Sequence, residues 1–298
     1  ALARADRSVL VLERARFPRD KTCGDGLTTA ALRELELLGL APARLPSWQE
    51  AHEVLLHAPD GATTAYRLPA GRGTYSAIVR REELDAALVD LARDAGATVL
   101  EGVQVDGVVQ DRDEVRVSAR DGATFAAPWM IGADGVWSPT RRALGRSPAG
   151  YRGEWHALRQ YVVDVAPAAA EAIHVWFEPD ILPAFVWSFP LADGAVNVGF
   201  GVRRDGGWPV GSLGRLWREL LERPGIRSVL GPAARGVGVP RAWPIPARVH
   251  RTTVADGRAL WVGDAAAATD PLSGEGIAQA LTTARLASAA VIDGGRRS

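Results

Sequence analysis

The sequence has very little of the chemistry that builds disulfides and metal sites. Cys23 is the single cysteine, so no disulfide can form within the chain and a cysteine-based metal site is excluded. The five histidines are scattered without the spacing of a ligand pair. We therefore predict no metal site. By default, the thiol of Cys23 is interpreted as buried and inert.

An excess of charge and long apolar segments are missing as well. The 298 residues include 35 basic and 35 acidic side chains, so the formal net charge is zero. Without a basic excess to neutralise phosphates, a nucleic-acid-binding surface is not expected. No apolar run approaches the length of a transmembrane helix, and the first residues do not have the pattern of a signal peptide. We expect a cytoplasmic protein that acts on a small molecule, and peripheral contact with a membrane surface stays open.

What the sequence does have is an informative loop near its end. A short apolar strand, residues 259–262, runs into Gly263 and Asp264. A loop of small residues then leads to a helix that begins near Gly276. Each piece alone would merely end a strand or start a helix. Together they combine glycines that let a ligand approach the backbone, a helix start that attracts an anion, and a carboxylate that suits a hydroxyl. A flavin dinucleotide carries both a pyrophosphate and ribityl hydroxyls, so the loop predicts a flavin site.

A second feature is the apolar strand of residues 8–13, which ends in Glu13. An acidic residue that closes the second strand of a dinucleotide-binding unit binds the adenosine ribose, about 20 residues beyond a Gly-x-Gly-x-x-Gly loop. Only twelve residues precede Glu13, and no such glycine motif occurs elsewhere in the chain. Either Glu13 is a ribose ligand in a fragment that lacks the first strand and glycine loop, or it is an ordinary strand-end carboxylate.

The order of predicted elements indicates two interleaved domains. Helical periodicity marks residues 28–38, 82–94 and 212–225, and alternating patterns mark a hairpin at 53–68, a meander at 102–135 and three strands between 171 and 204. Residues 231–247 are rich in Gly and Pro and are expected to cross between the domains. We predict an α/β fold in which a Rossmann-like dinucleotide-binding domain is interleaved with an antiparallel β-sheet substrate domain. The boundaries are 1–52, 74–150 and 241–298 for the first domain, and 53–73 and 151–240 for the second.

Five stretches together carry a resemblance to a known family. They are CGDGLT (23–28), Arg-x-x-Leu-Asp (81–85), GADGVWSPTRR (132–142), AFVWSFPLADGAVNVGFG (184–201) and WVGDAAAATDPLSGEGIAQAL (261–281). The set resembles the geranylgeranyl reductase family, FAD-dependent enzymes with the glutathione reductase/p-hydroxybenzoate hydroxylase type of fold, and covers nearly the whole chain. The fourth stretch is similar to that family's substrate motif Tyr-x-Trp-x-Phe-Pro followed by Asn-Val-Gly-x-Gly. Phe185 replaces the tyrosine here, which removes one hydroxyl that could contact substrate.

The resemblance implies roles for individual residues. Asp264 would bind a ribityl hydroxyl, Arg81 would contact the pyrophosphate or ribityl region, and Asp134 would organise the pyrophosphate region. No catalytic residue is identified, although Cys23, beside the isoalloxazine, is a candidate. The substrate pocket would be lined by Phe185, Trp187 and Phe189. The full set implied for cofactor binding is Glu13, Arg14, Cys23, Gly24, Arg81, Val105, Asp134, Gly263, Asp264, Pro271, Gly274, Gly276 and Ile277.

The implied activity is that of an FAD-dependent oxidoreductase acting on CH–CH groups. Reduced flavin would transfer a hydride to a carbon–carbon double bond of an isoprenoid chain, with NAD(P)H as the electron donor. One alternative is an aromatic monooxygenase or halogenase of the same fold. Another is an inactive fragment, because the chain is expected to be truncated at both ends relative to the family.

Overall fold

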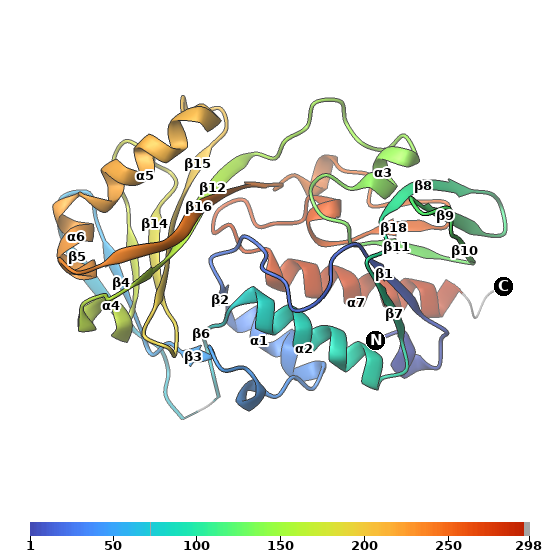
Figure 1. Cartoon of the computed structure of the whole chain (residues 1–298), viewed down its shortest axis with the longest axis horizontal. Coiled ribbons are helices and arrows are strands. Elements are labelled where there is room, and N and C mark those ends of the chain that lie inside the picture. Colours follow the sequence, from blue (N-terminus) through green and yellow to red (C-terminus); the bar gives the residue numbers. More distant parts are fainter. Residues whose placement is uncertain (72, 295–298) are drawn as a thin grey trace.

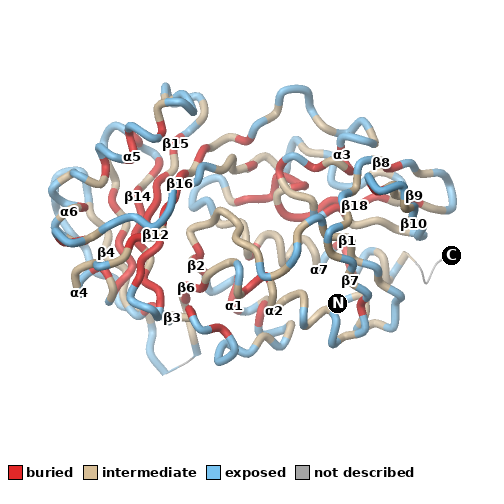
Figure 2. Tube along the Cα trace, in the orientation of Figure 1, coloured by how far each residue is buried: buried red, intermediate tan, exposed pale blue. Residues whose placement is uncertain are grey.

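The computed structural model describes residues 1–71 and 73–294 (Figure 1). A large sheet backed by helices forms one end of the molecule, and further helices with several small sheets form the other. Figure 2 shows that buried residues concentrate in the strands of the large sheet and in the segments that meet it near β2 and β6. Within the described residues, no helix is both long enough and apolar enough to cross a bilayer.

The large sheet has seven strands in the order β16-β12-β15-β14-β13-β4-β5. Two of them come from the hairpin predicted at 53–68, which is confirmed and pairs in parallel with β13 through β4. All other neighbours in the sheet are antiparallel. The strands are β4 (Glu53–His57), β5 (Thr63–Arg67), β12 (Trp155–Val163), β13 (Ile173–Trp176), β14 (Val186–Pro190), β15 (Val196–Arg203) and β16 (Arg235–Ile245).

Three helices cover one face of this sheet: α4 (Pro167–Glu171), α5 (Leu213–Leu221) and α6 (Pro224–Leu230). The apolar residues of α5 recur three and four positions apart, which places them on one face. Leu216 and Trp217 are buried there, and the Trp217 ring stacks on Phe200 of β15 with 6.1 Å between ring centroids. This apolar layer leaves the opposite face of the sheet free to meet the rest of the chain.

The prediction for residues 231–247 is wrong in part. Most of this Gly- and Pro-rich segment is the strand β16, which pairs along β12 instead of forming an irregular crossing. The pairing is possible because β16 is an edge strand, where Pro240 does not have to supply an N–H to a further neighbour. The Gly and Pro content of residues 231–247 indicated a loop, whereas the edge position of β16 in the sheet permits a strand.

The other end of the molecule contains the parallel pairs expected of an α/β fold. Strand β1 pairs in parallel with β7, and β11 pairs in parallel with β18. The predicted meander is confirmed as β8-β9-β10. The small strands are β1 (Leu10–Glu13), β2 (Gly26–Leu27), β3 (Gln49–Glu50), β6 (Ala77–Ile78), β7 (Thr98–Glu101), β8 (Val105–Gln110), β9 (Val115–Ala119), β10 (Thr124–Ala127), β11 (Met130–Gly132), β17 (Ala255–Asp256) and β18 (Ala259–Trp261).

Helices α1 (Thr29–Leu37), α2 (Arg81–Asp94) and α7 (Ile277–Gly294) pack together beside these strands, and α3 (Pro139–Ala143) follows β11. Their shared core includes Leu32 and Leu35 of α1, Leu84 of α2 and Ala278 of α7. The predicted fold class is confirmed by this combination of parallel pairs, covering helices and a large antiparallel sheet. The division into domains at the predicted boundaries stays a prediction.

Candidate cofactor and substrate site

The Gly-Asp loop is a tight turn packed against α7. Gly263 has a φ of +55°, which disfavours other residues, and a Cβ added there would lie 3.1 Å from Ala280. Its N–H donates to Thr283 Oγ1 of α7 over 3.0 Å. The next residue, Asp264, is half-buried and accepts from Thr269 Oγ1 at 3.2 Å. The turn therefore holds a carboxylate at the end of β18, as the sequence pattern predicts.

The entry to α7 is fixed by two further carboxylates. Asp270 accepts the N–H of Ser273 over 2.7 Å, and backbone and side-chain bonds from Ser273 lower the pKa of Asp270. Glu275 Oε1 accepts the N–H of Ala278 over 2.9 Å. The helix begins at Ile277, one residue after the predicted start. Because Glu275 already uses one N–H of the first turn, a bound anion at this helix end would have fewer donors than the sequence suggests.

Lys21 marks the place where several of the predicted cofactor residues gather. Burial lowers the pKa of the Lys21 amine; attraction to Asp264 opposes this effect and repulsion from Arg81 reinforces it. Cys23 also acts on the Lys21 amine. Asp264, Arg81 and Cys23 therefore all lie within electrostatic range of Lys21. Sequence reasoning missed Lys21, although its being the only lysine was a usable signal.

Arg81 is anchored in this group by Asp85, one turn further along α2. Its Nε and Nη2 donate to the two oxygens of Asp85 over 2.8 and 2.9 Å, and Arg19 donates to the same carboxylate over 2.7 Å. Burial alone would lower the pKa of Arg81, but Asp85, followed by Cys23, raises it. The guanidinium is thus a fixed positive charge beside Cys23.

The predicted substrate residues form an aromatic wall. Phe185, Trp187 and Phe189 alternate along the chain, so they share one face of the sheet, and consecutive ring centroids are 6.2 and 6.1 Å apart. This wall meets the segment Cys23–Gly26. A Cβ added to Gly24 would lie 3.4 Å from Phe189 and Trp187, and one added to Gly26 would lie 2.9 Å from Phe189. The structure therefore brings the substrate residues and the Cys23-Gly24 segment together.

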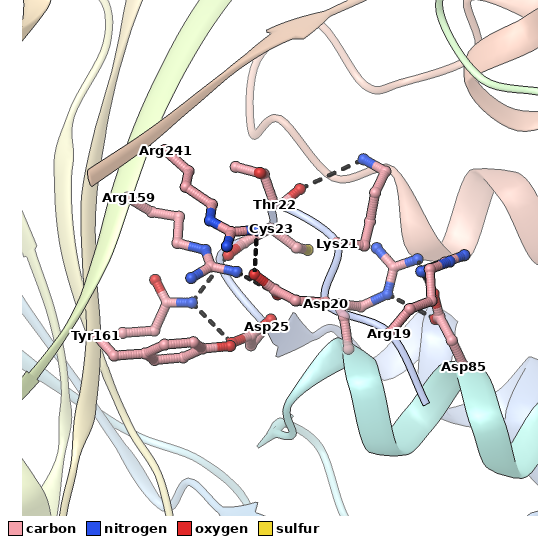
Figure 3. A network of polar contacts seen from close by, with 12 residues as sticks. Arg19, Asp20, Lys21, Thr22, Cys23, Asp25, Asp85, Arg159, Tyr161 and Arg241 are labelled. Atoms are coloured by element: carbon pink, nitrogen blue, oxygen red, sulfur yellow. Dashed lines mark hydrogen bonds and ion pairs between the residues drawn. The ribbon is translucent and has the colours of Figure 1, made fainter. Parts of the chain in front are cut away.

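The loop of residues 19–26, here called the cofactor loop, is tied to the large sheet by a polar network (Figure 3). Asp20 accepts from Arg159 over 2.6 Å and from Arg241 over 3.1 Å. Arg159 in turn lies 4.4 Å from the centroid of the Tyr161 ring, and the Tyr161 hydroxyl donates to Asp25 over 2.7 Å. Sequence reasoning singled out none of these five residues as site residues.

The remaining predicted cofactor residues contact mainly their own turns. Glu13 accepts the N–H of Ala15 over 2.8 Å, and Arg14 is exposed. Asp134 accepts from Ser138 Oγ over 2.6 Å and from the N–H of Thr140 over 2.8 Å, which stabilises the start of α3. In addition, Val105 is the first residue of β8, and Pro271 and Gly274 lie in the exposed loop before α7. Their roles toward the cofactor stay predictions.

Comparison with known proteins decides the family. A sequence model described as FAD binding domain matches residues 1–292. The chain belongs to this family. It is 35% identical to the menaquinone reductase of Mycolicibacterium smegmatis over 98% of this chain and 72% of the relative. It is 30% identical to the digeranylgeranylglycerophospholipid reductase of Methanothrix thermoacetophila, over 96% of this chain and 71% of the relative.

Comparison of the fold with solved structures agrees with the comparison of sequences. A crystal structure of a geranylgeranyl bacteriochlorophyll reductase-like protein from Thermoplasma acidophilum superposes with a TM-score of 0.84, covering 99% of this chain and 74% of that one, at 21% identity. The resemblance to the geranylgeranyl reductase family is confirmed. The chain is an FAD-dependent oxidoreductase of the geranylgeranyl reductase and menaquinone reductase type.

The residues present fit FAD at the end where the sheet and helices meet. Gly263 adopts a positive φ and its added Cβ would lie 3.1 Å from Ala280, so glycine keeps the turn close against α7 and holds Asp264 at the end of β18. Asp264 offers a half-buried acceptor for a hydroxyl, while Lys21 and Arg81 offer positive charge to the electron-rich parts of a flavin. These three side chains and the glycine turn are the residues that would hold the cofactor here.

Proposed function

We propose that this protein reduces carbon–carbon double bonds in an isoprenoid chain. The observation that carries the proposal is the aromatic wall of Phe185, Trp187 and Phe189, packed directly against the cofactor loop. In this proposal the three rings line the space that a hydrocarbon chain occupies beside the cofactor. The relatives support the same substrate class, since a menaquinone and a digeranylgeranylglycerophospholipid both carry isoprenoid chains.

In this proposal the protein supplies binding, orientation and exclusion of water. When bound and reduced, FAD would supply a hydride to one alkene carbon and a proton from an acid or water would reach the other, so the two electrons of the reduction would come from the cofactor. Asp264 and Arg81 hold the cofactor, and the aromatic wall holds the chain. We also propose NAD(P)H as the electron donor and peripheral contact with a membrane as the source of the apolar substrate.

Product analysis tests the proposal. The chain is loaded with FAD, reduced without oxygen, and incubated separately with an unsaturated menaquinone, a digeranylgeranyl lipid and a fully saturated analogue. After any quinol formed has been reoxidised to the quinone, we expect a product heavier by one H₂ from at least one unsaturated substrate and no change in the saturated one. A hydroxylated or halogenated aromatic product formed only in air would instead support the monooxygenase or halogenase alternative.

A further inference from the structure

Asn197 on β15 is fully buried, and each of its polar atoms has a partner from another segment. Its Oδ1 accepts from Trp187 Nε1 over 3.2 Å, and its Nδ2 donates to Cys23 O over 2.9 Å and to Asp25 Oδ2 over 2.8 Å. An indole N–H can only donate, so the orientation of the amide is fixed. One side chain thus connects the aromatic wall to the cofactor loop.

Asp25 is the second half of this connection. It is fully buried between two glycines and has a φ of +67°, a conformation that Asp and Asn tolerate better than most residues. Its Oδ2 accepts from both Asn197 and Tyr161, while Oδ1 is buried without a partner. Because both bonds fall on one oxygen, an asparagine at this position could accept both of them through its Oδ1.

The position of Trp187 depends on this connection. Its ring lies over Gly199 of β15, where an added Cβ would collide with it, and its edge lies against Gly24 of the cofactor loop. The bond to Asn197 fixes the indole nitrogen between these two contacts. A change in the Asn197 amide would therefore move the wall, the loop or both.

We propose that Asn197 is a positioning residue, which sets the spacing between the cofactor loop and the Trp187 wall, with Asp25 as its anchor on the loop. This spacing determines how deeply a flat apolar chain enters beside the cofactor. The proposal rests on the proposed function in one respect only, which is the identity of the substrate that lies between the wall and the loop. The contacts themselves join protein groups and can be tested without cofactor or substrate.

Cys23 provides the test because it is the only thiol in the chain and belongs to the cofactor loop. Cys23 is partly exposed, so the rate of its reaction with a thiol reagent in the FAD-free protein reports how far the loop shields the thiol. Asn197→Leu and Asp25→Ala remove the hydrogen bonds, and we expect Cys23 to react about tenfold faster or more in each. Tyr161→Phe removes one donor only and should give a smaller acceleration.

Two control variants distinguish loss of the Asn197–Asp25 connection from a general loosening of the fold. Asp25→Asn keeps an acceptor oxygen and should react within about twofold of the wild-type rate, since both bonds survive. Ser188→Ala changes a buried residue of β14 whose hydroxyl has no partner, and should also leave the rate unchanged. Wild-type rates in folded Asn197→Leu and Asp25→Ala would overturn the proposal. If Asn197→Leu does not fold, an unchanged rate in both Tyr161→Phe and Trp187→Phe would overturn it.

Kinetics distinguish this inference from the proposed function. If the wild-type protein reduces isoprenoid alkenes, Asn197→Ser should raise KM and lower kcat, because the wall and the cofactor loop no longer hold the chain at one depth. Unchanged KM and kcat in that variant would contradict the positioning role. If the wild type reduces no alkene but the thiol rates follow the predicted pattern, the proposed function fails and the positioning role stands.

Discussion

Asn197 Nδ2 lies 2.8 Å from Asp25 Oδ2, although the two residues are 172 positions apart in the sequence. The bond joins the seven-stranded sheet to the cofactor loop in a place that water does not reach, because both side chains are fully buried. A buried hydrogen bond between a carboxylate and an amide is costly to break, since the unpaired partner is left without solvent. The relative position of wall and loop is therefore strongly determined.

Replacing Asp25 by asparagine should stabilise the protein at neutral and alkaline pH. Burial raises the pKa of Asp25 from 3.8 to about 6, although Tyr161, Asn197, Arg159 and Arg81 all act to lower it. Below the pKa that Asp25 has in the unfolded chain, its carboxyl is protonated in both the folded and the unfolded state. As the pH rises from about 4 toward 6, the Asp25 carboxyl ionises in the unfolded chain but stays protonated in the folded protein, so the free energy of unfolding falls. Above pH 6 this loss of stability is complete and no longer changes with pH. This cost amounts to about 3 kcal/mol at most.

The measurement is the free energy of unfolding of wild type and Asp25→Asn between pH 4 and 8, in the FAD-free chain. We expect the variant to be more stable by about 1–3 kcal/mol at pH 8 and equal to the wild type near pH 4. A stability difference that does not change with pH would show that Asp25 does not titrate in this range.

Removing the carboxylate of Asp264 should weaken FAD binding. A hydrogen bond from a ligand hydroxyl to a charged acceptor is worth about 1.5–3 kcal/mol, so Asp264→Ala should raise the Kd for FAD by about tenfold or more. Asp205→Ala, which removes an exposed carboxylate paired with Arg203, is the matched control and should leave the Kd unchanged. Flavin fluorescence titration gives both values, and equal Kd values would exclude Asp264 as a ligand.

Two glycines of the cofactor loop should respond differently to the same added methyl group. In Gly26→Ala the Cβ would lie 2.9 Å from the Phe189 ring and push it, whereas in Gly24→Ala the nearest atoms are 3.4 Å away. We expect Gly26→Ala to raise KM for the isoprenoid substrate several-fold and Gly24→Ala to have a smaller effect. If Gly24→Ala proves the more damaging, the wall does not approach the loop as described.

The ion pair of Arg81 with Asp85 should contribute to stability in the FAD-free chain. Arg81→Met leaves Asp85, which is largely buried, with Arg19 as its remaining partner, and should cost about 2 kcal/mol. Arg33→Met removes an exposed pair with Glu36 and should cost less than about 0.5 kcal/mol. Urea unfolding of the two variants checks the difference, and equal costs would contradict the role assigned to Asp85.

Features that depend on residues close together in the sequence were predictable, and features that depend on residues far apart in the sequence were not. Gly263, Asp264 and the start of α7 follow one another directly, so their arrangement could be predicted from local turn and helix chemistry. Asp25 was quoted within a motif but given no role, because Tyr161 and Asn197 become its neighbours only when the sheet folds against the loop.

Strand β16 was missed for a related reason. Pro240 and the nearby glycines indicate a loop, and only the sheet order shows that this segment lies at an edge that tolerates them. Lys21 and Arg159 carry ordinary charges in the sequence. Their burial, which makes them part of the site, is a property of the fold.

The proposal that reduced FAD on this protein gives its electrons to an isoprenoid double bond is tested most directly by reoxidation of the bound, reduced flavin without oxygen, followed by its absorption in the visible range. The substrate is an unsaturated isoprenoid without a quinone ring, such as the digeranylgeranyl lipid, because a quinone could itself accept the two electrons. We expect recovery of the oxidised flavin spectrum together with a product that has gained one H₂, and neither with the saturated analogue. A flavin that stays reduced with every such isoprenoid, yet reoxidises in air with oxygenation of an aromatic compound, would rule out the proposed function.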